Sequence, residues 1–196
     1  IYWVSDIGDQ VIELADEGID QIRTSLLETV LPDAVENGMI LRVNGILWGN
    51  ALDNQLLGGA GTDYLMGEDG NDRLRGGASE DGLYGGNGND LLEGEDGDDA
   101  IEGGDGDDIL IGGLGADLLS GGAGNSNSFV FRSAAESTVL QPDLISDFYT
   151  GADRIDLSLF DGDTLSDGRQ ALHITSGPDG SAGALWWVAD GLGVVR

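Results

Sequence analysis

A nine-residue repeat fills the middle of the chain and constrains its fold more than any other feature. Glycine recurs at every ninth position from Gly49 to Gly121, and each unit follows the pattern G-G-x-G-x-D-x-U-x, in which U is a large apolar residue. Glycine permits positive φ angles and close backbone approach, so the first six residues of a unit predict a turn. The last three residues predict a short strand with one inward side chain.

One such strand buries too little surface to be stable alone, so the repeats must stack. Two nine-residue repeats form one coil of 18 residues, and the strand of each repeat pairs in parallel with the strand two repeats later. The predicted fold class is therefore all-β: a parallel β-roll, that is, a right-handed β-solenoid with capping flanks. Its core would be a column of apolar residues, namely Leu56, Leu65, Leu74, Leu83, Leu92, Ile101, Leu110 and Leu119, with Phe129 following after a slip of one residue.

The charge of the chain excludes several classes of function. It carries 37 acidic residues against 8 arginines, for a net charge of -29, and it has no cysteine. Nucleic-acid binding needs clustered basic residues, and membrane insertion needs an apolar run of about 20 residues, so neither is expected. A compact state this acidic repels itself unless bound cations neutralise it, whereas an apolar content of 40% argues against disorder throughout.

The repeats also place an aspartate at every ninth position. A solvated acidic face is the usual explanation for such charge, but a strict nine-residue period with glycines on both sides favours calcium binding. Asn54 and Ser126 stand at the two ends of the series and are poorer ligands. The candidate ligands are Asp63, Asp72, Asp81, Asp90, Asp99, Asp108 and Asp117.

Composition divides the chain into three parts: an N-terminal flank of short strands over residues 1–48, the β-roll over 49–128, and a C-terminal capping flank over 129–196. We expect a helical or irregular stretch near 24–31 and strands near 143–145 and 154–157. The chain starts at Ile1 without a signal-peptide pattern, and we expect it to be a piece of a longer protein.

The repeat resembles that of the repeats-in-toxin (RTX) family, the calcium-binding β-roll of proteins exported by Gram-negative bacteria. The flanks are similar to family members as well. Residues after the repeats resemble the same region of serralysin-type metalloproteases, in Ala135-Glu136-Ser137-Thr138, Pro142-Asp143-Leu144-Ile145-Ser146-Asp147-Phe148 and Gly151-Ala152-Asp153-Arg154-Ile155-Asp156-Leu157-Ser158. Gly183-Ala184-Leu185-Trp186-Trp187 resembles a common tail of exported members, and Gly8-Asp9, Glu17-Gly18-Ile19-Asp20 and Val35-Glu36-Asn37 resemble a module that often precedes such rolls.

The resemblance implies about five or more Ca²⁺ ions, each held between the turns of repeats i and i+2 by two aspartates and four backbone carbonyls. Ser79 replaces one turn glycine, which implies local strain, and Glu136 and Asp143 are expected to complete the last sites, opposite Asp117 and Ser126. The implied carbonyl ligands are Gly76, Gly85, Gly94, Gly103 and Gly112 at first positions, Gly59, Gly86, Gly104 and Gly113 at second positions, and Gly61, Gly70, Gly88, Gly97, Gly106 and Gly115 at fourth positions.

No catalytic constellation is expected in this chain. The H-E-x-x-H motif of zinc peptidases is missing, and His173, the one histidine, has no supporting triad signature. Trp186-Trp187 favours a capping core over a sugar-stacking platform. We therefore expect a calcium-binding module of a secreted bacterial protein. The module would fold on calcium binding outside the cell, and it would support export of the protein by the type I secretion machinery. The alternatives are a polysaccharide-binding or adhesion module, and the non-catalytic C-terminal part of a secreted enzyme.

Overall fold

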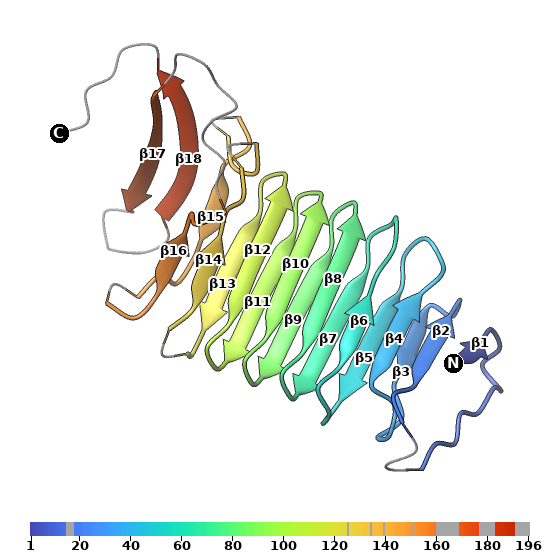
Figure 1. Ribbon diagram of the computed structural model, residues 1–196. Helices are drawn as coiled ribbons and strands as arrows, with labels where there is room; N and C mark the ends of the chain where they lie inside the picture. Colours follow the sequence, from blue (N-terminus) through green and yellow to red (C-terminus); the bar gives the residue numbers. More distant parts are fainter. Residues whose placement is uncertain are drawn as a thin grey trace.

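The computed structural model describes residues 1–196 except 15–17, 125, 134, 139, 150, 160–168, 177–182 and 191–196; for 169–176 and 183–190 it describes the backbone. The described residues form strands and turns without a helix, arranged in two long sheets that face each other (Figure 1). The predicted all-β class and parallel solenoid are confirmed.

Strands alternate between the two sheets along the chain. Sheet A contains, in spatial order, β1 (Tyr2–Val4), β2 (Gln21–Thr24), β4 (Asn37–Ile40), β6 (Gln55–Leu57), β8 (Arg73–Ala78), β10 (Leu91–Asp96), β12 (Ile109–Leu114), β14 (Ser128–Val130) and β16 (Arg154–Asp156). Sheet B contains β3 (Glu28–Val30), β5 (Ile46–Asn50), β7 (Tyr64–Asp69), β9 (Gly82–Asn87), β11 (Ala100–Asp105), β13 (Leu118–Gly122), β15 (Asp143–Ile145), β18 (Gly183–Asp190) and β17 (Arg169–Ser176).

The pairing register follows the predicted coil length. Leu92 in β10 pairs with Leu74 in β8 on one side and with Leu110 in β12 on the other, all in parallel. Most strands of the roll are longer than predicted, because β8 to β12 each continue through the first three residues of the next repeat. The backbone of those residues also pairs between coils, as Glu95 does with Gly77. The turns therefore shrink to the last three residues before the next strand, the third of which is the aspartate.

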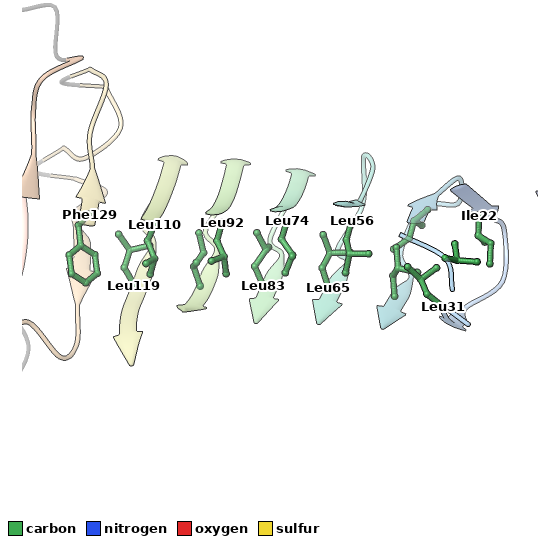
Figure 2. Close-up of a cluster of buried hydrophobic side chains, with 14 of the residues drawn as sticks. Ile22, Leu31, Leu56, Leu65, Leu74, Leu83, Leu92, Leu110, Leu119 and Phe129 are labelled. Atoms are coloured by element: carbon green, nitrogen blue, oxygen red, sulfur yellow. The ribbon is translucent and has the colours of Figure 1, made fainter. Parts of the chain in front are cut away.

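The apolar column is buried as predicted. Its leucines are 0% exposed and its isoleucine, Ile101, is 2% exposed, and Figure 2 shows leucines from the two sheets meeting in pairs along the axis. Each fully buried leucine contributes about 1.5–3 kcal/mol to the stability of the fold. The column continues into both flanks through Leu47 and Phe129.

The N-terminal flank adds strands to the same two sheets. The expected helical or irregular stretch at 24–31 is not helical and is irregular only over 25–27, because the residues on either side belong to β2 and β3. The hydroxyls of Thr24 and Thr29 hydrogen-bond to each other inside the coil at 2.8 Å, and the Thr24 hydroxyl accepts the amide of Leu26. A side-chain hydroxyl thus satisfies the N–H of Leu26, a backbone donor that a regular helix or strand would pair with a carbonyl.

The C-terminal flank ends the parallel stack. β14 and β16 extend sheet A and β15 extends sheet B, after which β18 pairs with β15 in the antiparallel sense and β17 pairs with β18. The flank is also attached by charge, since Arg132 forms an ion pair with Glu93, which in turn pairs with Arg75. Phe129, Phe131 and Ile145 of this flank are buried at the end of the roll. Phe148 is 37% exposed, and its ring centroid lies 6.0 Å from that of Phe129.

Candidate metal centres in the turns

The repeat aspartates form two ladders, one along each row of turns. In each ladder the backbone N–H of one aspartate donates to the Oδ1 of the aspartate one coil later, as from Asp63 to Asp81 at 2.7 Å and from Asp90 to Asp108 at 2.8 Å. Ladder B, which precedes the strands of sheet B, consists of Asp63, Asp81, Asp99, Asp117 and Asp143. Ladder A, which precedes the strands of sheet A, consists of Asn54, Asp72, Asp90, Asp108, Asn127 and Asp153.

The second carboxylate oxygen of most ladder aspartates has no partner. All of these side chains are at most 4% exposed. A buried carboxylate oxygen without a donor or a cation is costly, and native structures rarely retain one. Within the described part of the chain, the oxygens concerned are the Oδ2 atoms of Asp72, Asp81, Asp90, Asp99, Asp108, Asp117 and Asp143.

The same burial disfavours the charged form of these groups. Burial, reinforced by neighbouring carboxylates, raises the pKa of Asp143 to about 8 and the pKa of Asp117 to about 7. It raises the pKa values of Asp72 and Asp81 to about 7 and that of Asp99 to about 6, although a backbone N–H bond opposes the shift in each case. Near neutral pH, these buried carboxylates are therefore stable only when a proton or a cation neutralises their charge.

A backbone carbonyl of the next coil lies near the unpartnered oxygens of Asp72, Asp90, Asp99 and Asp108. A Cβ atom on Gly67 would overlap both the Oδ2 of Asp72 and the carbonyl oxygen of Gly85 in the next coil. At the fourth position a Cβ atom on Gly88, whose φ is +133°, would overlap the carbonyl oxygen of Gly70 in the preceding coil. First-position carbonyls thus point back, and fourth-position carbonyls point forward, into the gap between stacked turns.

These donors are all oxygen atoms, which suits a hard cation such as Ca²⁺. No group of three or more His, Cys, Asp or Glu side chains with a metal-binding arrangement occurs among the described residues. A cation in these gaps would consequently depend on two aspartates and on main-chain carbonyls, which is the ligand set expected from the resemblance. The unpartnered Oδ2 atoms and the surrounding carbonyls fit such an ion.

The N-terminal ends of the ladders differ from their middle. Both oxygens of Asp63 are satisfied, Oδ1 by the N–H of Gly45 at 2.6 Å and Oδ2 by the N–H of Gly59 at 2.8 Å. Asn54 bonds to Asn50 twice, once through its side-chain oxygen and once through its side-chain nitrogen. In this N-terminal part of the ladders, backbone and side-chain amide N–H groups therefore satisfy the side-chain oxygens. The unpartnered Oδ2 atoms of the later coils have no such donor.

At the C-terminal end the structure corrects the expected pairings. Asn127, not Ser126, occupies the ladder position and accepts the N–H of Asp108 at 2.9 Å, because the last repeat contains one extra residue. Asp143 follows Asp117 rather than Ser126, since the loop before β15 lengthens this coil from 18 to 26 residues. Asp153 then follows Asn127.

Glu136 lies outside both ladders. Its carboxylate accepts the N–H of Arg132 at 2.7 Å, and it lines a hollow beside sheet A together with Glu95 and Asp96. Its charge nevertheless lies close enough to Asp117 and Asp143 to raise the pKa of both carboxyl groups, so the expectation that Glu136 completes the last site beside Asp117 stays a prediction. The sequence does contain a signal for the correct order, because the D-x-U spacing of the repeats recurs at Asp143-Leu144-Ile145 and at Asp153-Arg154-Ile155.

A second, outer ladder was not expected. At the fifth position of the units, the side-chain oxygen of Asp53 accepts the N–H of Asn71 at 2.8 Å, and the oxygen of Asn71 accepts the N–H of Asn89 at 2.9 Å. Asn89 continues the series to Asp107. These bonds run in the opposite direction to those of the aspartate ladders, so each turn is tied to its neighbours from both sides.

Ser79 adopts the conformation expected from its position. Its φ of +81° lies in the left-handed region that favours glycine. Glu68 and Glu95, at second positions of their units, share this conformation with φ values of +80° and +81°. The turn geometry is therefore imposed by stacking even where the residue disfavours it.

A parallel β-solenoid with buried aspartate ladders between glycine turns is an RTX-type β-roll. The sequence matches the family model of the peptidase M10 serralysin C terminus over residues 23–177, and the chain belongs to this family. The family comprises the non-catalytic repeat part of serralysin-type proteases, whose repeats bind calcium. No curated protein matches the chain. The described part contains no helix long and apolar enough to cross a membrane.

Proposed function

We propose that this chain is a calcium-dependent folding module of a secreted protein. The observation that supports this function is the set of seven buried Oδ2 atoms without a partner, in a chain of net charge -29. Calcium supplies the positive charge that these oxygens lack and joins consecutive coils through them.

Six gaps lie between pairs of ladder aspartates. Each would be completed by first- and fourth-position carbonyls, which face the gap. The second-position carbonyl of Gly59 and the third-position carbonyl of Asp105 already accept backbone N–H groups of the neighbouring coil and would have to share them with the ion. The gaps are Asp63/Asp81, Asp81/Asp99, Asp99/Asp117 and Asp117/Asp143 in ladder B, and Asp72/Asp90 and Asp90/Asp108 in ladder A. Gaps that involve Asn127 contain only one carboxylate and would bind more weakly.

Calcium availability then decides where the module folds. Extracellular calcium modules bind with dissociation constants of about 10⁻⁴–10⁻³ M, near the calcium concentration outside cells. A ligand that binds only the folded state stabilises it by mass action, so folding follows export. The unfolded acidic chain inside the cell would be the substrate of type I secretion machinery, in agreement with a family of secreted proteases.

The family match also supports the expectation that the chain is the non-catalytic part of a secreted enzyme. The polysaccharide-binding or adhesion alternative stays a prediction, and the side chains of Trp186-Trp187, the candidate sugar-stacking platform, lie outside the described residues. Nothing in the ladders favours that alternative.

The test is far-UV circular dichroism of the chain in calcium-free buffer, during titration with CaCl₂ and during a parallel titration with MgCl₂. We expect a disordered spectrum that becomes β-rich cooperatively with calcium, and little change with magnesium, which prefers small octahedral sites and retains its water. A β-rich spectrum that is identical with and without calcium would overturn the proposal.

A further inference from the structure

The outer face of sheet B carries an aromatic strip formed by Trp48, Tyr64, Met66 and Tyr84. Trp48, Met66 and Tyr84 occupy matching positions on the adjacent strands β5, β7 and β9, because Trp48 pairs with Met66 and Met66 pairs with Tyr84. Tyr64 and Tyr84 remain 47% and 40% exposed, although they lie in the most regular part of the roll. The strip therefore presents aromatic surface that the fold itself does not use.

Gly82 allows these rings to lie close to the sheet. A Cβ atom on Gly82 would lie 2.7 Å from Cδ1 of Tyr64 and 3.4 Å from Cε2 of Tyr84. Both rings thus approach bare backbone between them. Exposed tyrosine rings are surfaces on which a planar or cationic group can stack.

A rim of carboxylates borders the strip at the C-terminal ends of the strands. A hollow of about 400 Å³ is lined by Met66 and Tyr84 together with Glu68, Asp69, Glu102 and Asp105. A second hollow of about 400 Å³ shares Glu68 and Asp69 and extends to Trp48 and Asp33. The two form one continuous acidic border along the aromatic strip.

The positive charges of the roll lie elsewhere. Its two arginines, Arg73 and Arg75, are in β8 of sheet A, where Arg75 pairs with Glu93 and Glu95. Arg132 of the C-terminal flank also pairs with Glu93. Among the described residues no basic side chain lines either hollow, and none forms an ion pair with Glu68, Glu102 or Asp105. The rim acids also stand outside the aspartate ladders, so calcium in the turns would leave them unpaired.

We propose that the strip and its rim bind an extended, arginine-containing segment of a partner protein. Guanidinium groups would stack on Tyr64 and Tyr84, and the rim would pair with their charge. Arginine favours such sites because it is planar, weakly hydrated and able to bind a carboxylate through two donors. A neutral sugar would also stack on the rings but would have no need of the rim, and an anionic polysaccharide would be repelled by it.

The experiment measures fluorescence polarisation of a labelled peptide of alternating arginine and serine with the calcium-saturated chain at physiological ionic strength. Four variants are compared, each shown by circular dichroism to keep its fold. Tyr64→Ala/Tyr84→Ala removes the exposed rings, and Glu102→Gln removes one rim charge. Glu80→Gln makes the same change at an exposed turn at the opposite end of the sheet B strands. Glu68→Gly removes a second rim charge and relieves the positive φ of Glu68.

We expect the double tyrosine variant to weaken binding by about tenfold or more, and each rim variant by about threefold. Glu80→Gln should bind like the original chain. Equal affinity of the double tyrosine variant, or equal losses for Glu80→Gln and Glu102→Gln, would show non-specific attraction and overturn the proposal. Tight, tyrosine-dependent binding of a neutral oligosaccharide with no peptide binding would overturn it in favour of a sugar site. The readout uses folded protein, so it is separate from the test of calcium-dependent folding.

Discussion

At the scale of single residues, the aspartates of the repeat are equivalent in sequence but not in structure. Asp99 has neighbours in ladder B on both sides, and its Oδ2 is unpartnered. Asp63 has the same place in its repeat, yet backbone N–H groups satisfy both of its oxygens. The demand for a cation is therefore concentrated in the middle and at the C-terminal end of the ladders.

Asp99→Asn tests this difference. The substitution keeps the size of the side chain and removes charge from two adjacent gaps, so the calcium concentration at the folding midpoint should rise by roughly threefold or more. Ser126→Ala, at an exposed residue outside the ladder, should leave the midpoint unchanged. Calcium titrations followed by circular dichroism compare the two, and equal midpoints would contradict the arrangement between coils.

Asn127 offers the reverse test. Its side-chain nitrogen lies against Gly121, where other units place an aspartate Oδ2, and this nitrogen has no acceptor. Asn127→Asp should restore a second carboxylate to the gap with Asp108 and complete the pair with Asp153. We expect calorimetry to report at least one more bound calcium per chain. An unchanged stoichiometry would show that the local coil geometry, not the missing charge, limits this end.

At the scale of elements, each ladder behaves as a row of coupled carboxyl groups. Burial raises the pKa values of six of them to between about 6 and about 8, from an ordinary value of 3.8, namely Asp72, Asp81, Asp99, Asp108, Asp117 and Asp143. The folded state without calcium therefore holds more protons than the unfolded state. Stability from these groups is then complete below about pH 4 and is lost as the pH rises through 6 to 8.

Acidification should therefore replace part of the calcium requirement. In calcium-free buffer we expect β structure to increase as the pH falls from 8 towards 5, whereas bound calcium should dissociate over the same range as protons compete for the carboxylates. Circular dichroism and calcium release, measured at stepwise pH, check the two halves of the prediction. A calcium-free chain whose β content falls on acidification would contradict the assigned pKa shifts.

The C-terminal flank contributes both core and ladder to the roll. It supplies Phe129 and Phe131 to the end of the apolar column, Asp143 to ladder B, and Arg132 to the ion pair with buried Glu93. A chain truncated after Asn127 should fold only at much higher calcium concentration, or not at all. Calorimetric titration of the full and shortened chains measures this, and identical cooperativity in both would reduce the flank to a tether.

The sequence predicts some elements of the fold better than others, for physical reasons. The nine-residue repeat correctly predicted the coil length, the parallel register and the leucine column, because every unit repeats the same pattern. It underestimated strand length, since glycine has little strand preference of its own and pairs here through its neighbours in adjacent coils. It missed the strands on either side of the bend at 25–27, where the hydroxyls of Thr24 and Thr29 hydrogen-bond to each other. It also placed Asp143 opposite Ser126, because an insertion before β15 breaks the 18-residue count.

At the scale of the whole molecule, the net charge of the chain and the stacking of its coils depend on each other. Stacking places acidic turns about 4.8 Å apart, which a chain of net charge -29 tolerates only with counterions in place. Arg75 in β8 and Arg132 in the C-terminal flank both pair with Glu93 of sheet A, so the carboxylates that border the aromatic strip on sheet B keep their charge. Folding and partner binding would thus use separate sets of carboxylates.

The central claim is that the ladder aspartates hold calcium between consecutive coils. It is tested most directly by the anomalous difference map of a crystal grown with calcium. We predict peaks in the gaps between successive aspartates of each ladder, including Asp81/Asp99, Asp99/Asp117 and Asp117/Asp143, with first- and fourth-position carbonyl oxygens as neighbours. A folded roll whose ladders show no anomalous density, with water or protons satisfying the Oδ2 atoms instead, would contradict the account.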